Sequence, residues 1–119
     1  MEKAESTIAQ MRKGVLEMSV MAAINGNEAY ASDILERLKQ AHLIVVEGTL
    51  YPILTRLKND GFLSYRWEES TSGPPRKYYS MTASGHDFLI ELQSGWSDLV
   101  SAVNLLFAAK DSSEQTNNL

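Results

Sequence analysis

The sequence predicts a mainly α-helical fold with a small β-hairpin, arranged as a winged helix-turn-helix followed by a long C-terminal dimerisation helix. Two amphipathic helical stretches separated by a short link come before two stretches of alternating polar and apolar residues. A long helical stretch with heptad spacing of its apolar residues follows them. We expect a winged helix-turn-helix domain at residues 6–81, a dimerisation helix at 82–109 and a disordered tail at 110–119.

The composition is that of a soluble globular chain, with 119 residues, 44% of them hydrophobic and 22% charged. The absence of cysteine excludes disulfides, a thiolate nucleophile and a cysteine zinc site, and favours a cytoplasmic location. We expect no membrane partner, because no apolar run is long enough to span a bilayer. The two histidines, His42 and His86, stand alone and no carboxylates are paired, so we expect neither enzymatic activity nor a cofactor or metal.

The charge is unevenly distributed along the chain, although the net charge is −4. Residues 1–36 hold three Lys/Arg and six Asp/Glu (−3), residues 37–80 hold seven and four (+3), and residues 81–119 hold one and five (−4). A basic segment between acidic flanks is compatible with binding to a phosphate backbone, since local potential matters there more than net charge.

The first predicted helix, residues 6–24, has two apolar stripes. One contains Ile8, Met11, Val15, Met18 and Ala22, and the other contains Leu16, Val20 and Ala23. Two stripes indicate that one faces the helix's own domain and the other faces a partner chain or ligand. A central core helix with two buried sides is the alternative.

The next two predicted helices form the helix-turn-helix. After a terminating Asn-Gly-Asn, a helix at residues 32–41 begins with Ser32 as N-cap, and an apolar connector at 42–46 leads to a helix at 47–61. With Thr49 as its N-cap, Pro52 would fall in the first turn, and Gly61 would end the helix. A leucine stripe opposite a small, polar and basic face suits a major-groove recognition helix, although an ordinary surface helix fits this stretch about as well.

Strands are predicted at residues 62–69 and 76–81, around a turn at 70–75. We interpret this hairpin as the wing, with Arg76 and Lys77 near its tip. Thr82 then caps the last helix, whose apolar residues step by three and four as Leu89, Leu92, Trp96, Leu99, Val103 and Leu106. This heptad pattern predicts a homodimer.

Three stretches, MRKGVLE at 11–17, EGTLYPILTRL at 47–57 and SGPPRKYY at 72–79, resemble the PadR family of bacterial transcriptional regulators. The resemblance is to the short branch with one C-terminal helix, and it covers residues 11–95. Two positions depart from the family pattern: Ala31-Ser32 stands where a Gly-Tyr pair is common, and His42 stands where glycine is common.

The resemblance implies a dimeric repressor that binds double-stranded DNA, at a pseudo-palindromic operator. We expect Thr49, Tyr51, Pro52 and Thr55 to approach base edges, and Arg56, Lys58, Arg76 and Lys77 to meet phosphates. Similarity to the multidrug-binding members implies a planar aromatic or phenolic ligand at the dimer centre, stacked between a tryptophan from each final helix. The expected ligand-binding residues are Val15, Met18, Leu92, Trp96, Leu99 and Val100. The alternative function is a dimeric winged-helix interaction module that does not read DNA sequence.

Overall fold

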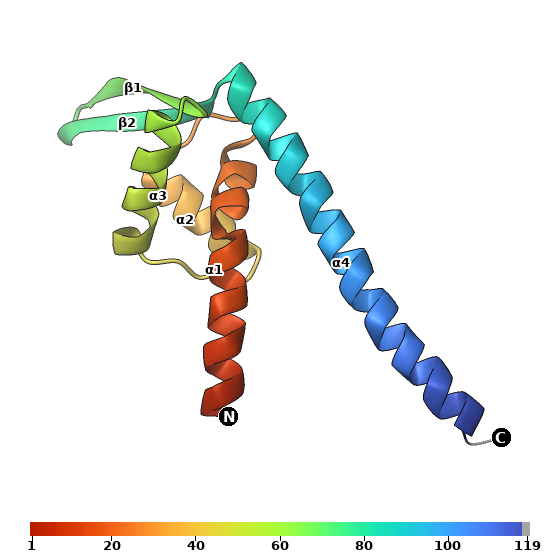
Figure 1. Cartoon of the computed structure of the whole chain (residues 1–119). Coiled ribbons are helices and arrows are strands. Elements are labelled where there is room, and N and C mark those ends of the chain that lie inside the picture. Colours follow the sequence, from red (N-terminus) through yellow and green to blue (C-terminus); the bar gives the residue numbers. More distant parts are fainter. Residues whose placement is uncertain (118–119) are drawn as a thin grey trace. The chain divides into compact units, whose positions relative to one another are not determined.

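The computed structural model describes the backbone of residues 1–117 and the side chains of residues 1–109. It confirms the predicted fold class, with four helices and one two-stranded antiparallel sheet in this part of the chain (Figure 1). The elements in order are α1 (Glu2–Ile24), α2 (Ala31–Gln40), α3 (Glu47–Asn59), β1 (Leu63–Ser70), β2 (Gly73–Met81) and α4 (Ala83–Asn117). The chain divides into two compact units, Met1–Leu89 and Ile90–Leu119.

The core of the first unit lies where α1, α2, α3 and the hairpin meet, and it also takes in the first turns of α4. The helices each contribute one apolar face to it, and the hairpin contributes the base of its strands. Its buried side chains include Val20, Met21, Ile24, Ile34, Leu38, Leu50, Leu54, Leu57, Leu63, Tyr79 and Leu89.

Helix α1 begins at Glu2, four residues before the predicted start. Its two stripes differ in burial. Val20 of the second stripe is fully buried, whereas Ile8 and Met11 of the first stripe are exposed. The buried face is completed by Met21 and Ile24, which neither predicted stripe contained. The first stripe is therefore the apolar surface that this helix leaves uncovered by its own unit.

Helix α2 begins at Ala31, one residue before the predicted start, and its N-cap is Tyr30 rather than Ser32. The Asp33 carboxylate accepts a hydrogen bond from the Tyr30 backbone N–H at 3.0 Å. At the other end His42 has a φ of 63°. Its N–H donates to the Lys39 carbonyl and the N–H of Leu43 donates to the Leu38 carbonyl, which is the Schellman pattern. His42 therefore occupies a left-handed position that glycine usually fills.

Replacing His42 by glycine is expected to stabilise the fold by about 0.5–1 kcal/mol, because glycine avoids the steric cost of left-handed backbone but loses more chain entropy on folding. Chemical denaturation of the variant and the wild type measures the difference. His42→Ala, which keeps a Cβ, is the control and should give no such gain. Equal stability of the glycine variant and the wild type would show that the His42 side chain makes a compensating interaction.

Helix α3 begins at Glu47, the start of the predicted stretch, but its N-cap is Val46. The predicted cap at Thr49 is wrong, and Pro52 lies in the second turn rather than the first. Pro52 has no N–H to donate to the Gly48 carbonyl, so one hydrogen bond of the helix is lost. Gly61, with a φ of 83°, follows the C-cap as predicted.

In the hairpin, β1 keeps the predicted length but lies one residue further along the chain, whereas β2 is longer than predicted and includes Pro74 and Pro75. Arg76 pairs with Glu68 and Lys77 pairs with Trp67, whereas the turn lies between Ser70 and Gly73. The prediction that Arg76 and Lys77 lie near the tip is therefore wrong. They stand in the middle of the wing, because β2 starts before the two prolines rather than after them.

The start of α4 is fixed to the end of α3. The Thr82 hydroxyl accepts the Gly85 N–H at 3.0 Å, which confirms the predicted N-cap. The hydroxyls of Thr82 and Ser84 both donate to the Gly61 carbonyl, at 2.6 and 2.9 Å. The rings of Phe62 and Phe88 stack with centroids 4.1 Å apart.

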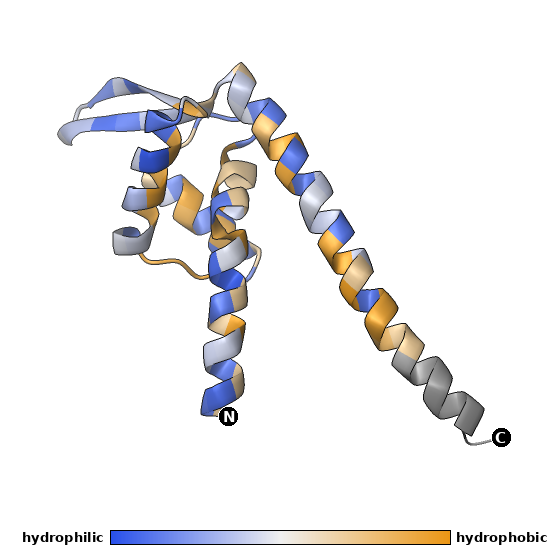
Figure 2. Cartoon of the chain, in the orientation of Figure 1, coloured by the Kyte–Doolittle hydropathy of each residue, from blue (hydrophilic) through white to orange (hydrophobic). Residues whose placement is uncertain are grey.

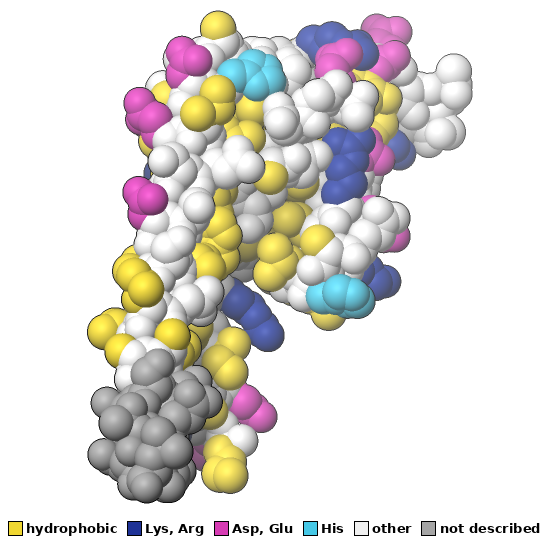
Figure 3. Space-filling view, turned by 90° about the vertical axis from the view of Figure 1, so that its right-hand side faces the viewer, with side chains coloured by type: hydrophobic (Ala, Val, Ile, Leu, Met, Phe, Trp, Pro, Cys, Tyr) yellow, Lys and Arg dark blue, Asp and Glu magenta, His cyan; other side chains and the backbone are white. Residues whose placement is uncertain are grey.

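Beyond this junction α4 is a single helix that continues to Asn117, past the predicted end at residue 109. The predicted disordered tail begins inside this helix, and its residues 118–119 lie outside the described residues. Apolar residues recur along α4 (Figure 2), and their side chains protrude from the helix that ends in the grey region of Figure 3. They include Trp96, 45% exposed, Leu99, 60% exposed, and Leu106, 73% exposed. The second unit thus carries an apolar face that its own residues do not cover.

Candidate nucleic-acid interface

Helix α3 has one buried and one exposed side. Leu50, Ile53, Leu54 and Leu57 face the core, as their spacing predicted. At 100° per residue, the positions opposite this face are Gly48, Pro52, Thr55 and Asn59, and all four are exposed. Two of them, Pro52 and Thr55, were predicted contacts. A face of small and polar residues lets a helix backbone come close to base edges in a major groove.

The other predicted contacts on α3 lie on its two flanks. Thr49 and Arg56 lie on the side toward α1, where the Arg56 guanidinium is 3.7 Å from the Glu17 carboxylate. Tyr51 lies on the side toward the wing. The ammonium of Lys58, on the same side, lies 5.7 Å from the centroid of the Tyr65 ring. The structure therefore brings Tyr51, Thr55 and the wing together and separates Thr49 and Arg56 from them.

An open cleft of about 450 Å³ lies between α2, α3 and the wing. The start of α2, the exposed side of α3 and the facing surface of both strands form its walls. The lining residues are Tyr30, Ala31, Ser32, Glu47, Tyr51, Thr55, Trp67, Pro75, Arg76, Lys77 and Tyr79. The cleft thus joins four predicted DNA contacts, Tyr51, Thr55, Arg76 and Lys77, with residues that the sequence did not single out.

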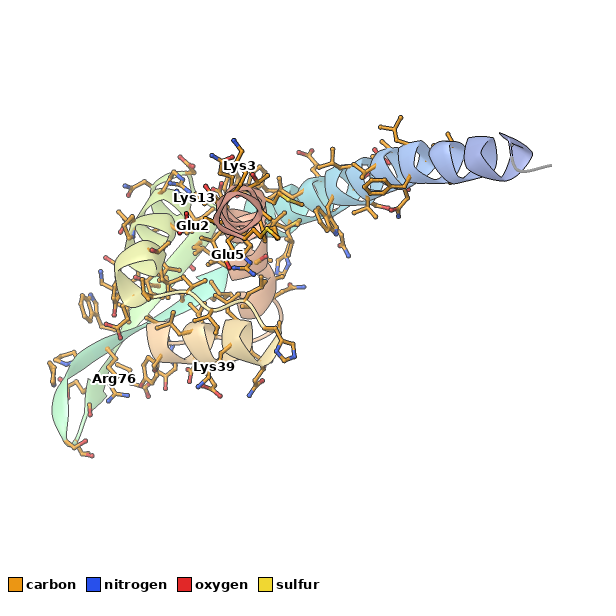
Figure 4. The ribbon with its side chains drawn as sticks, turned by 90° about the horizontal axis from the view of Figure 1, so that it is seen from below. Glu2, Lys3, Glu5, Lys13, Lys39 and Arg76 are labelled. Carbon is orange, nitrogen blue, oxygen red and sulfur yellow. The ribbon has the colours of Figure 1, made fainter. Side chains whose placement is uncertain are left out.

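The wing is held against α2 by a stack of four side chains. The Arg76 guanidinium lies 5.1 Å from the centroid of the Tyr30 ring, which stacks on Tyr78 with centroids 3.7 Å apart. Arg66 covers the other face of Tyr78 at 4.6 Å and forms an ion pair with Glu28 at 2.7 Å. Figure 4 shows Arg76 on the side of the hairpin near α2. The stack orients Arg76 toward the start of α2.

The second cation of the wing, Lys77, is also positioned by aromatic rings. Its ammonium lies 4.5 Å from the centroid of Tyr65 and 5.2 Å from that of Trp67. Cation–π contacts of this kind hold a charge in place without neutralising it. Within residues 1–109, neither Arg76 nor Lys77 forms an ion pair with a carboxylate. Both charges are thus available to an anion.

Tyr78 and Tyr79 add no negative charge to this surface. A side-chain hydrogen bond between Tyr78 and Tyr30 is the main cause that raises the pKa of Tyr78 to about 12. Desolvation by burial raises the pKa of Tyr79. Both phenols are therefore neutral near pH 7, and Glu47 is the carboxylate that lines the cleft.

The six predicted ligand-binding residues belong to both units. Val15 and Met18 are half-buried on α1 in the first unit. In the second unit Leu92 is half-buried, whereas Trp96, Leu99 and Val100 are exposed. On each helix these side chains form part of an apolar face.

Sequence reasoning missed Trp67, Tyr30 and Gly48 as parts of this surface. Leu63, Tyr65 and Trp67 alternate with polar residues, a pattern that predicts one buried strand face, yet Trp67 is 60% exposed. Tyr30 lay in a predicted loop before α2, and Gly48 lay before Thr49, the predicted N-cap of α3. The four charged or aromatic residues in RKYY gave the one usable signal, because such residues often gather at a nucleic-acid surface.

No helix among the described residues is long and apolar enough to cross a membrane. Nor do these residues contain a group of three or more His, Asp or Glu side chains that could hold a metal ion.

A model of the PadR-like transcriptional regulator family matches residues 20–91. The fold resembles a PadR-like transcription factor from Bacteroides fragilis, which is 57% identical, with 85% of this chain and 98% of that chain covered and a TM-score of 0.73. It also resembles a PadR family regulator from Eggerthella lenta, at 30% identity, 89% and 93% coverage and a TM-score of 0.83.

The Bacillus subtilis PadR in complex with operator DNA is 23% identical over 66% of this chain and 46% of that one, with a TM-score of 0.62, and this likeness concerns the fold alone. The family match and the two closer structures agree with the resemblance found in the sequence motifs. The chain belongs to the PadR-like family of transcriptional regulators, and it is a regulator rather than an enzyme.

Proposed function

We propose that this regulator is a dimeric repressor that binds an operator in double-stranded DNA with α3 in the major groove and the wing on the sugar–phosphate backbone. The observation that carries the proposal is the continuous surface formed by the exposed side of α3 and the cleft of the wing. Thr55, Pro52, Tyr51 and Thr49 approach base edges in this arrangement, and Arg56, Lys58, Arg76 and Lys77 meet phosphates.

The division of contacts follows from the placement of the side chains. The exposed side of α3 is narrow and carries no charge at Pro52 or Thr55, so it can enter a groove without meeting phosphates. The cations lie at its margins and on the wing, where a helix in the major groove would have a phosphate strand on each side. The B. subtilis PadR, a protein of the same fold, forms a complex with operator DNA, which supports DNA as the partner of this surface.

Dimerisation through α4 gives the repressor its symmetry. The α4 helix has 35 residues, which corresponds to roughly 50 Å at 1.5 Å per residue. Among its exposed apolar residues are four of the predicted heptad seam, Trp96, Leu99, Val103 and Leu106, whereas Leu92 of the seam is half-buried. A two-fold dimer would present two α3 helices to two half-sites, which requires a pseudo-palindromic operator.

A planar aromatic or phenolic ligand would bind at the centre of this dimer, between Trp96 and its symmetry mate, with Leu92, Leu99 and Val100 beside the rings. The support is the exposed indole of Trp96 in an otherwise apolar seam, next to Gly95, where an added Cβ would meet nothing within 4 Å. A ligand bound there would contact both protomers, so the arrangement of the dimer interface would depend on ligand binding.

Titration with planar dyes tests the ligand site in a Trp67→Phe background, where Trp96 is the remaining indole. Offset stacking contributes about 0.5–1.5 kcal/mol per ring, so Trp96→Ala, which removes both rings of the dimer, should weaken dye binding by about tenfold or more. Trp67→Ala is the matched control and should bind dye as the wild type does. A dye that binds Trp96→Ala and wild-type dimers equally well, or that leaves Trp96 emission unchanged, contradicts the site.

The DNA contacts of the wing are tested by a salt series on duplex DNA from upstream of the gene. Arg76→Ala and Lys77→Ala should each weaken binding to all sequences and reduce the salt slope by about two units, one phosphate per protomer. Lys39→Ala, a cation outside the cleft, is the control and should leave the slope unchanged. Wild-type slopes in both wing variants would remove the wing from the interface, and no binding by the wild type would favour an interaction module instead.

A further inference from the structure

The exposed indole of Trp67 has no role in the proposed DNA contacts. Burial falls steadily along β1, since Leu63 is 2% exposed, Tyr65 is half-buried and Trp67 is 60% exposed. All three lie on the same face of the strand, but that face leaves the core as the hairpin extends away from α3. Trp67 therefore belongs to the cleft rather than to the core.

The indole is held in place although it is exposed. Tyr65 meets it edge to face with centroids 6.0 Å apart and an interplanar angle of 90°. Lys77 is the residue of β2 that pairs with Trp67, and its ammonium lies 5.2 Å from the centroid of the indole ring. An aromatic side chain with fixed neighbours loses little rotamer freedom on binding, which makes it an efficient contact for a partner.

The walls of the cleft define what could lie against this indole. Lys77 supplies a positive charge beside it, Arg76 supplies a second one on the α2 side of the cleft, and α3 supplies Tyr51 and Thr55 on the opposite wall. Glu47 also lines the cleft, so an anion would be attracted to the wing side and repelled from the α3 side. A chain with regularly spaced negative charges and apolar C–H surface between them matches both the cations and the indole.

We propose that Trp67 contacts the operator directly, with the indole packed against a deoxyribose of the strand whose phosphates bind Arg76 and Lys77. This inference rests on the proposed DNA-binding function and deepens it. A duplex keeps its bases stacked, so the C–H face of the sugar is the apolar surface that the backbone offers to the indole. The contact makes Trp67 an uncharged positioning residue, because it fixes how the wing sits on the backbone without reading a base.

The sugar–phosphate backbone fits the cleft better than a free planar ligand does. The cleft is open along its length between α3 and the wing, so it does not enclose a small molecule on all sides. A DNA strand that leaves the groove occupied by α3 must cross this space to reach the outer part of the wing.

The emission of Trp67 during titration with duplex DNA tests the contact directly. In a Trp96→Phe dimer, Trp67 is the remaining indole, and its emission should change in a saturable way at the stoichiometry of the complex. In the otherwise wild-type protein, Trp67→Ala should weaken operator binding by about tenfold. The salt slope should remain that of the wild type, because no phosphate contact is removed.

Two comparisons separate this role from a structural one. Trp67→Phe should recover part of the lost affinity, since it restores an aromatic face, whereas Trp67→Ala should unfold at the wild-type temperature because the side chain is mostly exposed. Lys77→Ala should lower the salt slope, unlike either Trp67 variant.

Wild-type operator affinity in Trp67→Ala, or an emission unchanged by saturating DNA, would overturn the inference and leave the proposed function intact. Loss of affinity together with a reduced slope or a lowered unfolding temperature would also overturn it. A wild-type protein that binds no duplex DNA would instead refute the proposed function itself.

Discussion

Combining Leu99→Asp with Val103→Asp is expected to convert the proposed dimer to a monomer and to abolish operator binding. Both side chains are exposed on α4 of the single chain and lie on the proposed seam. A dimer would bury four carboxylates there without cationic partners, because none of residues 81–109 is Lys or Arg. At about 3–5 kcal/mol for an uncompensated buried charge, even one such carboxylate would weaken association by at least about a hundredfold.

Sedimentation measures the outcome. Ser101→Asp is the matched control, because position 101 lies on the opposite side of α4 from the seam and adds the same charge. The control should remain dimeric and bind DNA. A stable dimer that carries both seam substitutions would show that Leu99 and Val103 are not at the interface.

Gly85→Ala is expected to destabilise the first unit by about 1–3 kcal/mol, although alanine is the better helix former. A Cβ at Gly85 would collide with the backbone carbonyl oxygen of Phe62. That oxygen also accepts the Thr82 N–H at 3.1 Å, so it cannot move without breaking the junction between α3 and α4. The strain would fall on the segment that joins the recognition helix to α4.

Thermal unfolding of the variant measures this effect. Gly14→Ala, in α1, is the control, because an added Cβ there meets nothing within 4 Å, and it should be neutral or stabilising. Equal unfolding temperatures for Gly85→Ala and the wild type would mean that the start of α4 is not held against Phe62.

The periodic patterns in the sequence predicted the elements correctly because each pattern reports a local property. The leucine spacing of α3 follows from its one buried face, and Gly61 follows from the need for left-handed backbone after the last turn. Thr82 was predictable as a cap because its hydroxyl can accept an N–H three residues later. Fold class and element order therefore needed no tertiary information.

The misplaced boundaries have local causes that the pattern could not reveal. Tyr30 and Val46 are unusual N-caps, and neither forms a side-chain cap hydrogen bond, so Ser32 and Thr49 were the better candidates by residue type. Pro74 and Pro75 were placed in the turn because proline disrupts a sheet interior. In a two-stranded sheet every strand is an edge, and β2 tolerates both.

The sequence predicted which segments form the candidate site, but not which face of each segment a residue lies on. Thr49 and Arg56 share a helix with Tyr51 and Thr55, and deciding which flank faces α1 requires the tertiary packing seen in the Arg56–Glu17 contact. The burial of Leu63 and the exposure of Trp67 arise because a strand leaves the core along its length. An alternating pattern shows which residues share one face of a strand. It does not show how far along the strand the core covers that face.

Binding of the wild-type protein to a labelled duplex from upstream of its gene, at several salt concentrations, is the most direct test of the central claim. We expect two protomers per duplex and a steep salt dependence of the affinity. The affinity should be at least a hundredfold higher than for a scrambled duplex, which corresponds to a difference in binding free energy of about 3 kcal/mol or more. Equal affinity for both duplexes with the same slope, or no binding at low salt, would contradict a repressor that reads an operator with α3 and the wing.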